Sequence, residues 1–114
     1  MTSDRRKGEE RRGVRRFEIS VDIEWEAGEG RHKGVIGDIS QMGCLVLCSG
    51  VVEDGDEVKL YLPVSDGMRI EFTGEIINHV QEIGFGMKFV GLNSAQEEVI
   101  ARLIRSSKEG RATA

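Results

Sequence analysis

The chain has 114 residues, of which 39% are apolar and 32% charged, a composition that fits one globular domain with a core of its own. No apolar run approaches the roughly 20 residues that cross a bilayer, and the first 16 residues lack the apolar part of a secretory signal, so we expect a cytoplasmic protein without membrane insertion. The net charge of −4 divides into +4 for residues 1–16 and −8 for the remainder, which argues against binding a nucleic-acid polymer over the whole surface.

Strict alternation predicts the first strand over residues 17–26. Phe17, Ile19, Val21, Ile23 and Trp25 alternate with polar, mostly acidic residues. Successive side chains of a strand point to opposite faces, so this pattern is typical of a half-buried strand. A turn over residues 27–30 follows it.

Five further strands are expected along the chain. The predicted ranges are residues 32–37, 43–48, 58–62 (ended by Pro63), 70 to 76 or 77, and 85–89. A polar step over residues 38–43 separates the second strand from the third. The strands begin about a dozen residues apart with glycine-bearing turns between them, which predicts an all-β fold, a small antiparallel barrel or sandwich.

One helix is predicted at the end of the chain. Ser94 and Glu97 form a capping box, with Ser94 as the N-cap residue. Apolar residues then recur at helical spacing over 99–104 and form one stripe. We expect this stripe to seal an open end or face of the barrel, or else to form a dimer contact.

No group of residues in the sequence favours catalysis, a cofactor or a metal site. Cys44 and Cys48 lie about 13 Å apart on one predicted strand at ~3.3 Å per residue, too far for a disulfide, and we interpret them as two buried thiols. His32 and His79 have no Cys or second His near them in the sequence that would complete a ligand set. No Walker-type phosphate loop occurs, so we do not expect an enzyme.

Two short motifs stand out at the ends of the first two predicted strands. The sequence RRGVRR precedes the first strand, and DISQMG follows the second. Together they resemble the PilZ family, which is marked by RRxxxR before the first strand and [D/N]xSxxG after the second. The matching residues are Arg11, Arg12, Arg16, Asp38, Ser40 and Gly43.

The resemblance covers about residues 9–105 and implies both a fold and a ligand. It implies a six-stranded antiparallel PilZ-type β-barrel with a C-terminal helix over residues 11–107. We expect a flexible basic and polar arm over 1–10 and a frayed tail over 108–114. The ligand it implies is cyclic di-GMP, bound by the six motif residues.

The chemistry of the motif residues fits a guanine nucleotide. An arginine guanidinium matches the O6/N7 edge of guanine and also binds phosphate oxygens. The carboxylate of Asp38 accepts hydrogen bonds from guanine N1–H and N2–H₂, and Ser40 adds a hydroxyl donor. Gly43 allows an unusual backbone dihedral and close approach of a ligand. The register of the arginine pair is open, because Arg11 and Arg15 have the same spacing as Arg12 and Arg16.

We therefore expect a receptor that changes conformation on binding cyclic di-GMP and signals to an unidentified effector protein, as a monomer or weak dimer. One alternative is a PilZ-like protein–protein interaction module that does not bind nucleotide. A small barrel that binds nucleic acid through its basic arm is a further alternative, but the chain has few aromatic residues for base stacking.

Overall fold

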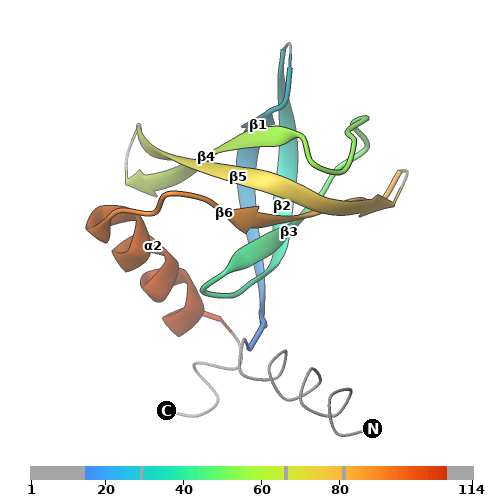
Figure 1. Ribbon diagram of the computed structural model, residues 1–114. Helices are drawn as coiled ribbons and strands as arrows, with labels where there is room; N and C mark the ends of the chain where they lie inside the picture. The colour runs from blue at the N-terminus through green and yellow to red at the C-terminus, as the bar shows by residue number, and fades with distance from the viewer. Residues whose placement is uncertain (1–14, 29, 66, 81, 108–114) are drawn as a thin grey trace, which may run out of the picture.

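The computed structural model describes residues 15–28, 30–65, 67–80 and 82–107, which form six strands and one helix (Figure 1). All strand pairs are antiparallel, and the sheet closes into a barrel in the order β1-β2-β3-β6-β5-β4. The prediction of a six-stranded antiparallel barrel with a C-terminal helix is confirmed. The elements are β1 (Phe17–Glu26), β2 (Arg31–Ile39), β3 (Gly43–Leu47), β4 (Glu57–Ser65), β5 (Met68–Val80), β6 (Gly84–Phe89) and α2 (Ser94–Arg105).

The inward faces of all six strands supply one apolar core. Trp25, Phe72 and Phe85 are its largest side chains, and each is only 1% exposed. The rings of Trp25 and Phe85 meet edge to face, with 5.2 Å between their centroids. In β1 the buried Ile23 and Trp25 alternate with the partly exposed Glu24, as the sequence pattern predicts.

Helix α2 covers one open end of the barrel (Figure 1). Ile100 is buried, and Val99, Leu103 and Ile104 pack against the core cluster. The apolar stripe therefore acts as a lid over the core, which is the first of the two roles expected for it.

The helix cap lies one residue earlier than predicted. Asn93, rather than Ser94, is the N-cap residue, and Gln96 takes the place expected for Glu97. The Asn93 Oδ1 accepts from the Gln96 N–H at 2.8 Å, and the Gln96 Oε1 accepts from the Asn93 N–H at 2.7 Å. Asn and Gln satisfy a capping box as well as Ser and Glu do. Gln96 Nε2 also donates to the Glu71 carbonyl at 2.8 Å, which ties this end of α2 to β5.

Three strands are longer than the sequence indicated. β2 includes Asp38, which was expected in the interrupting step, and β5 continues to Val80. β4 passes through Pro63, so the prediction that this proline ends the strand is wrong. Pro63 keeps its register with Arg69 of β5, and a strand tolerates proline where its nitrogen faces away from a hydrogen-bonded neighbour.

Only a short ladder joins β1 to β4. It comprises three residue pairs, in which residues 24–26 of β1 lie opposite residues 59–61 of β4. Within the described residues, the β1 segment 17–23 has no strand partner on its β4 side. We call the line along which β1 and β4 separate the seam.

Candidate functional site

The pairing of β1 with β2 brings the described motif residues to one end of the barrel. Phe17 lies opposite Ile39, and Glu18 lies opposite Asp38. Arg16 directly precedes Phe17, so it lies beside the chain that leaves β2 at Ser40. The β1–β2 hairpin thus brings Arg16 and Ser40, which are far apart in the sequence, next to each other in space.

A bulge turns the Asp38 side chain outward. In the β2–β3 ladder Ile36 pairs with Val46, but Asp38 pairs with Leu45, so Gly37 is an extra residue in β2. Ile36 and Ile39 are both fully buried, whereas Asp38 is partly exposed. Without the extra residue, strict alternation could not bury residues 36 and 39 together. The bulge therefore keeps the core sealed while the carboxylate faces the surface.

Ser40 holds the turn between β2 and β3. Its Oγ accepts from the Met42 and Gly43 N–H groups, both at 3.1 Å, and its hydroxyl donates to the Gly43 carbonyl at 3.3 Å. The Ser40 N–H donates to the same carbonyl at 2.8 Å. Ser40 is only 5% exposed. Ser40 therefore stabilises the β2–β3 turn, and its role as a hydroxyl donor to a ligand stays a prediction.

Gly43 permits a close approach of two strands. A Cβ at this position would overlap the carbonyl oxygen of Met87 and crowd the Cα of Lys88, both on β6. Gly43 does not have a positive φ, so the expected unusual dihedral is absent. The neighbour that requires glycine here is β6.

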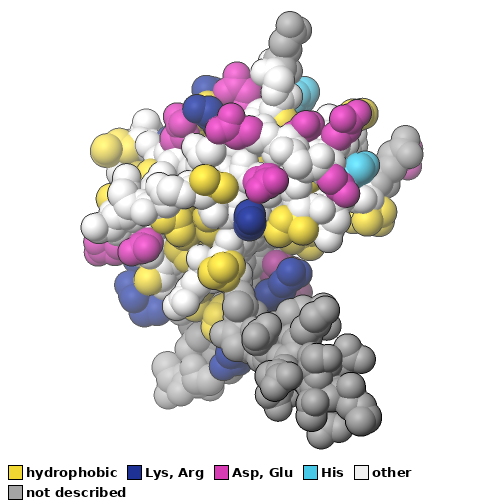
Figure 2. Space-filling view, viewed as in Figure 1, with side chains coloured by type: hydrophobic (Ala, Val, Ile, Leu, Met, Phe, Trp, Pro, Cys, Tyr) yellow, Lys and Arg dark blue, Asp and Glu magenta, His cyan; other side chains and the backbone are white. Residues whose placement is uncertain are grey.

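Basic side chains lie near the start of β1 and on the last turn of α2. In the space-filling view, Asp and Glu side chains are most numerous over the upper half of the visible face, and several Lys and Arg side chains lie in its lower half (Figure 2). The last turn of α2 carries Arg102 and Arg105. Arg15 and Arg16 are exposed, and the Arg15 guanidinium lies 5.2 Å from the centre of the Phe17 ring. An anion is attracted to such a surface.

The remaining sequence predictions for this site lie outside the described residues. Arg11 and Arg12 belong to residues 1–14, as does the arm over 1–10, and the tail over 108–114 is also outside. The choice between the two registers of the arginine pair stays a prediction.

Sequence reasoning missed Glu18 as a neighbour of the site. Glu18 is exposed and directly opposite Asp38. Directly opposed residues have Cβ atoms about 5 Å apart, and two like charges at that separation destabilise the pair. Two carboxylates therefore face the surface together, beside Arg16. The alternation of β1 shows that Glu18 points outward, but its partner depends on a second register shift, between Glu18 and Val21.

The Asp38 carboxylate also affects a buried thiol. Burial, and secondarily the negative charge of Asp38, raise the pKa of Cys44 far above its ordinary value. Burial also raises the pKa of Cys48, and a backbone hydrogen bond at Gly50 opposes that effect. Cys44 is buried as expected, but Cys48 is partly exposed, and both are free thiols.

We expect Cys44 to resist alkylation in the folded protein. Iodoacetamide reacts with the thiolate. The raised pKa keeps the Cys44 thiol protonated at pH 8, and its burial keeps the reagent from reaching the sulfur. Mass spectrometry should find Cys44 unmodified, Cys48 modified slowly, and both modified in 6 M guanidinium chloride, a denaturant concentration above the roughly 5 M that marks hyperstable proteins. Rapid modification of Cys44 without denaturant would contradict its burial.

Two further findings concern the described part of the chain. It contains no group of three or more His, Cys, Asp or Glu side chains placed to hold a metal ion. It also contains no helix of the length and apolarity that a membrane span requires.

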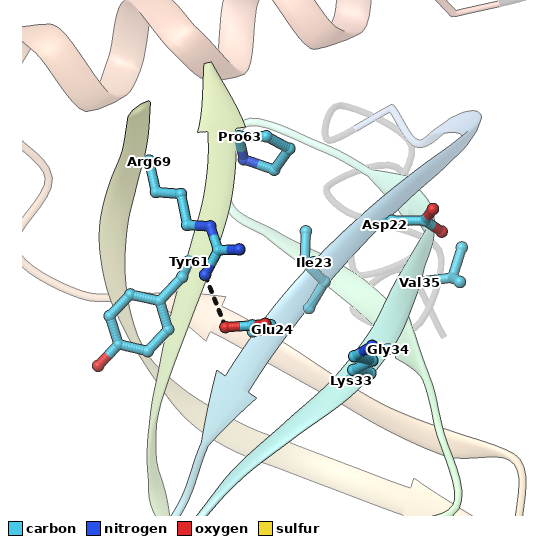
Figure 3. A pocket seen from close by; sticks show the side chains of 9 residues that line it. All are labelled: Asp22, Ile23, Glu24, Lys33, Gly34, Val35, Tyr61, Pro63 and Arg69. Atoms are coloured by element: carbon cyan, nitrogen blue, oxygen red, sulfur yellow. Dashed lines mark hydrogen bonds and ion pairs between the residues drawn. The ribbon is translucent and has the colours of Figure 1, made fainter. Parts of the chain in front are cut away.

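A pocket of about 600 Å³ opens on the outer surface at the seam (Figure 3). Residues 22–24 of β1 and 33–35 of β2 form one side, and Tyr61, Pro63 and Arg69 of β4 and β5 form the other. We call it the seam pocket. It includes none of the described motif residues, and four strand positions, or about 13 Å at ~3.3 Å per residue, separate Asp22 from Glu18. It is therefore distinct from the candidate site.

Comparisons with known proteins agree with this geometry. The family model described as "PilZ domain" matches residues 8–106. A comparison with curated proteins finds no match. Among solved structures, the PilZ domain of CeSA from a cellulose-synthesizing bacterium is 23% identical, with a TM-score of 0.62 over 79% of this chain and 94% of that one.

Two similar structures contain cyclic di-GMP. The PilZ domain of YcgR from Escherichia coli, solved with c-di-GMP, is 13% identical, with a TM-score of 0.71 over 90% of this chain and 95% of that one. The PlzA protein of Borreliella burgdorferi, in complex with c-di-GMP, is 17% identical, with a TM-score of 0.68 over 90% of this chain and 45% of that one. At these identities the likeness to the three structures is one of fold.

Proposed function

This chain belongs to the PilZ domain family, and from that membership we propose that it is a receptor that binds cyclic di-GMP and signals to a partner protein. The observation that carries the proposal is the β1–β2 register, which makes Arg16 and Asp38 neighbours at one end of the barrel. The cyclic di-GMP complexes of YcgR and PlzA support the choice of ligand.

The residues divide the recognition of the nucleotide between them. Arg12 and Arg16 bind a guanine edge or a phosphate, because a guanidinium donates two parallel hydrogen bonds to either. Asp38 accepts from the N1–H and N2–H₂ groups of guanine, which a phosphate-only ligand lacks. Ser40 and Gly43 hold the β2–β3 turn in the shape that presents these groups. No bond is made or broken in this scheme, so the protein is a receptor and not an enzyme.

Isothermal titration calorimetry tests the proposal directly. Cyclic di-GMP should bind, while GTP and a single-stranded DNA oligonucleotide should give far less heat at the same concentrations. The same titration gives the stoichiometry, which distinguishes one bound nucleotide from an intercalated pair. Absence of cyclic di-GMP binding by the folded protein would refute the receptor function and favour a protein–protein interaction module.

Asp38→Ala is expected to reduce the preference for guanine. Removing a carboxylate cannot weaken the attraction of a phosphate, but it removes the acceptor for guanine N1–H and N2–H₂. Wild type should therefore prefer cyclic di-GMP to cyclic di-AMP by a wide margin, and the variant should narrow the ratio of the two dissociation constants roughly tenfold, as for one lost base contact.

Glu18→Ala is the matched control for this experiment. It removes the same charge from the residue directly opposite Asp38. Both dinucleotides should bind it slightly more tightly, with their ratio unchanged. Equal binding of the two dinucleotides by wild type, or an equal loss of selectivity in both variants, would contradict the role of Asp38.

A further inference from the structure

A bulge in β5 turns the side chain of Asn78 outward. Ile76 is only 1% exposed, so strict alternation would point Asn78 into the core as well. The β5–β6 ladder shifts its register between these two residues, which makes Ile77 an extra residue in β5. Asn78 is therefore exposed. Bulges are common beside functional sites, where they redirect a side chain, and the bulge at Gly37 redirects Asp38 in the same way.

Asp38 and Asn78 lie at the two ends of one cross-strand row. The pairs that define it are Asp38 with Leu45, Leu45 with Gly86, and Gly86 with Asn78. We call these four residues the outer row. It crosses β2, β3, β6 and β5 on the outer face, over about 14 Å at ~4.8 Å between neighbouring strands. Its Asp38 end belongs to the candidate site, so the row extends that site across the barrel surface.

The middle of the outer row is low and open. Leu45 is partly buried, and Gly86 has no side chain. Among the described residues other than its chain neighbours, a Cβ built on Gly86 would have only the Asn78 side chain within 4 Å, with the Asn78 Oδ1 at 3.0 Å. The Asn78 amide therefore lies beside Gly86 on the outer face. A flat base can lie on this floor, because glycine allows a ligand to approach the backbone closely.

The Asn78 amide is available to a ligand. Within the described parts of the chain, no hydrogen bond or ion pair involves this side chain. An amide presents a donor and an acceptor side by side. The Watson–Crick edge of guanine presents the complementary groups, because its O6 accepts and the neighbouring N1–H donates. An asparagine amide can therefore form two hydrogen bonds with one guanine.

From the two bulges, the open floor at Gly86 and the unused amide, we propose that the outer row binds the second guanine of cyclic di-GMP. The base lies over Gly86 and against Leu45. The Asn78 Nδ2–H donates to guanine O6, and the Asn78 Oδ1 accepts from guanine N1–H. Asp38 holds the first guanine at the opposite end of the row, and the ribose–phosphate ring of the dinucleotide joins the two. This inference rests on the proposed receptor function and adds a residue that contacts the ligand.

Substitutions on β5 and β6 test the outer row by calorimetry. Asn78→Ala should weaken cyclic di-GMP binding roughly tenfold, as for one lost base contact. Gly86→Ala should also weaken binding, because the added Cβ occupies the floor on which the base lies. Thr73→Ala is the matched control, since it truncates a polar side chain of the same strand outside the row, opposite Lys59 of β4. It should bind as wild type does.

A change of selectivity separates base recognition from a structural role of Asn78. An amide fits guanine or, turned over, adenine, whereas a carboxylate only accepts hydrogen bonds. Asn78→Asp should therefore widen the preference for cyclic di-GMP over cyclic di-AMP roughly tenfold. Both dinucleotides carry the same charge, so the added negative charge does not change the ratio of their dissociation constants.

NMR spectroscopy observes the proposed contact directly. In ¹⁵N-labelled wild type, the side-chain NH₂ signals of Asn78 are identified by their absence from the spectrum of Asn78→Asp. These signals should shift when cyclic di-GMP is added. A residue that only shapes the strand would not show this shift together with the change in selectivity.

The outcomes distinguish this inference from the receptor function. Binding of cyclic di-GMP that Arg16→Ala weakens and Asn78→Ala does not would overturn the role of the outer row and leave the receptor function standing. An unchanged selectivity in Asn78→Asp, or Asn78 side-chain signals that do not move at saturation, would have the same meaning. Absence of cyclic di-GMP binding by the folded wild type would overturn both.

Discussion

Arg16→Ala is expected to weaken cyclic di-GMP binding roughly 30- to 1,000-fold while the barrel remains folded. The substitution removes the charge-assisted contact that we propose Arg16 makes to the nucleotide, at the point where the chain enters β1. Arg16 is exposed, so its loss should change the free energy of unfolding by no more than about 0.5 kcal/mol. Calorimetry gives the affinity, and urea unfolding followed by Trp25 fluorescence gives the stability.

Arg31→Ala provides the control, because it removes the same charge at the far end of the β1–β2 ladder, where Arg31 lies opposite Glu26. It should bind cyclic di-GMP as wild type does. Arg12→Ala should be as damaging as Arg16→Ala. Wild-type affinity in both would defeat the site assignment, whereas damage only from Arg11→Ala and Arg15→Ala would favour the other register of the arginine pair.

Gly43→Ala is expected to lower the free energy of unfolding by about 3 kcal/mol, the upper range for forcing an extra carbon into a packed position. The added Cβ would overlap backbone atoms of Met87 and Lys88, which cannot rotate away as a side chain can. The turn held by Ser40 would shift with β3, so nucleotide affinity should fall in the same variant. The midpoint of urea unfolding measures the first effect, and calorimetry below that midpoint measures the second.

Gly86→Ala is the comparison for this substitution. Its Cβ would meet the end of the Asn78 side chain, which can move aside, so the loss of stability should be below about 1 kcal/mol. If Gly43→Ala unfolded at the same urea concentration as wild type, the close contact between β3 and β6 would be wrong.

The sequence predicts the barrel well where burial and alternation agree. β1 is predicted to its ends because its inward residues are apolar and its outward residues polar along its whole length. The apolar stripe over residues 99–104 predicts α2 for the same reason, but its apolar residues recur at the spacing of a helix and do not alternate as in a strand. The cap was displaced by one residue because Asn93 and Ser94 are both good N-cap residues, and only the contact of Gln96 with β5 separates them.

The sequence predicts which residues belong to the candidate site, but it does not predict how these residues are arranged in space. The sequence identifies the motif residues Arg16, Asp38, Ser40 and Gly43. It does not show that the Ser40 hydroxyl makes its hydrogen bonds within the β2–β3 turn. A bulge inserts a single residue into one strand and so shifts its register with the neighbouring strand. An alternating sequence pattern shows which residues face outward, but it does not show which residue of the neighbouring strand lies opposite each of them. For that reason the opposition of Glu18 and Asp38 could not be predicted.

The prediction that Pro63 ends β4 was wrong because it, too, depended on which strands are neighbours in the sheet. A sequence shows that a proline cannot donate, but it does not show which side of the strand needs a donor. Only the order of strands in the closed sheet answers that question, because β4 pairs fully with β5 and briefly with β1.

The brief β1–β4 ladder has a consequence for the order of folding. The β1–β2, β2–β3, β4–β5 and β5–β6 pairs join strands adjacent in the chain, so each hairpin closes with a small loss of chain entropy. Two ladders join strands distant in the chain, β3 to β6 by five residue pairs and β1 to β4 by only three. Long-range contacts are expected to form after local ones, and the β1–β4 ladder has the fewer pairs to offset its loss of chain entropy, so we expect it to close the ring last.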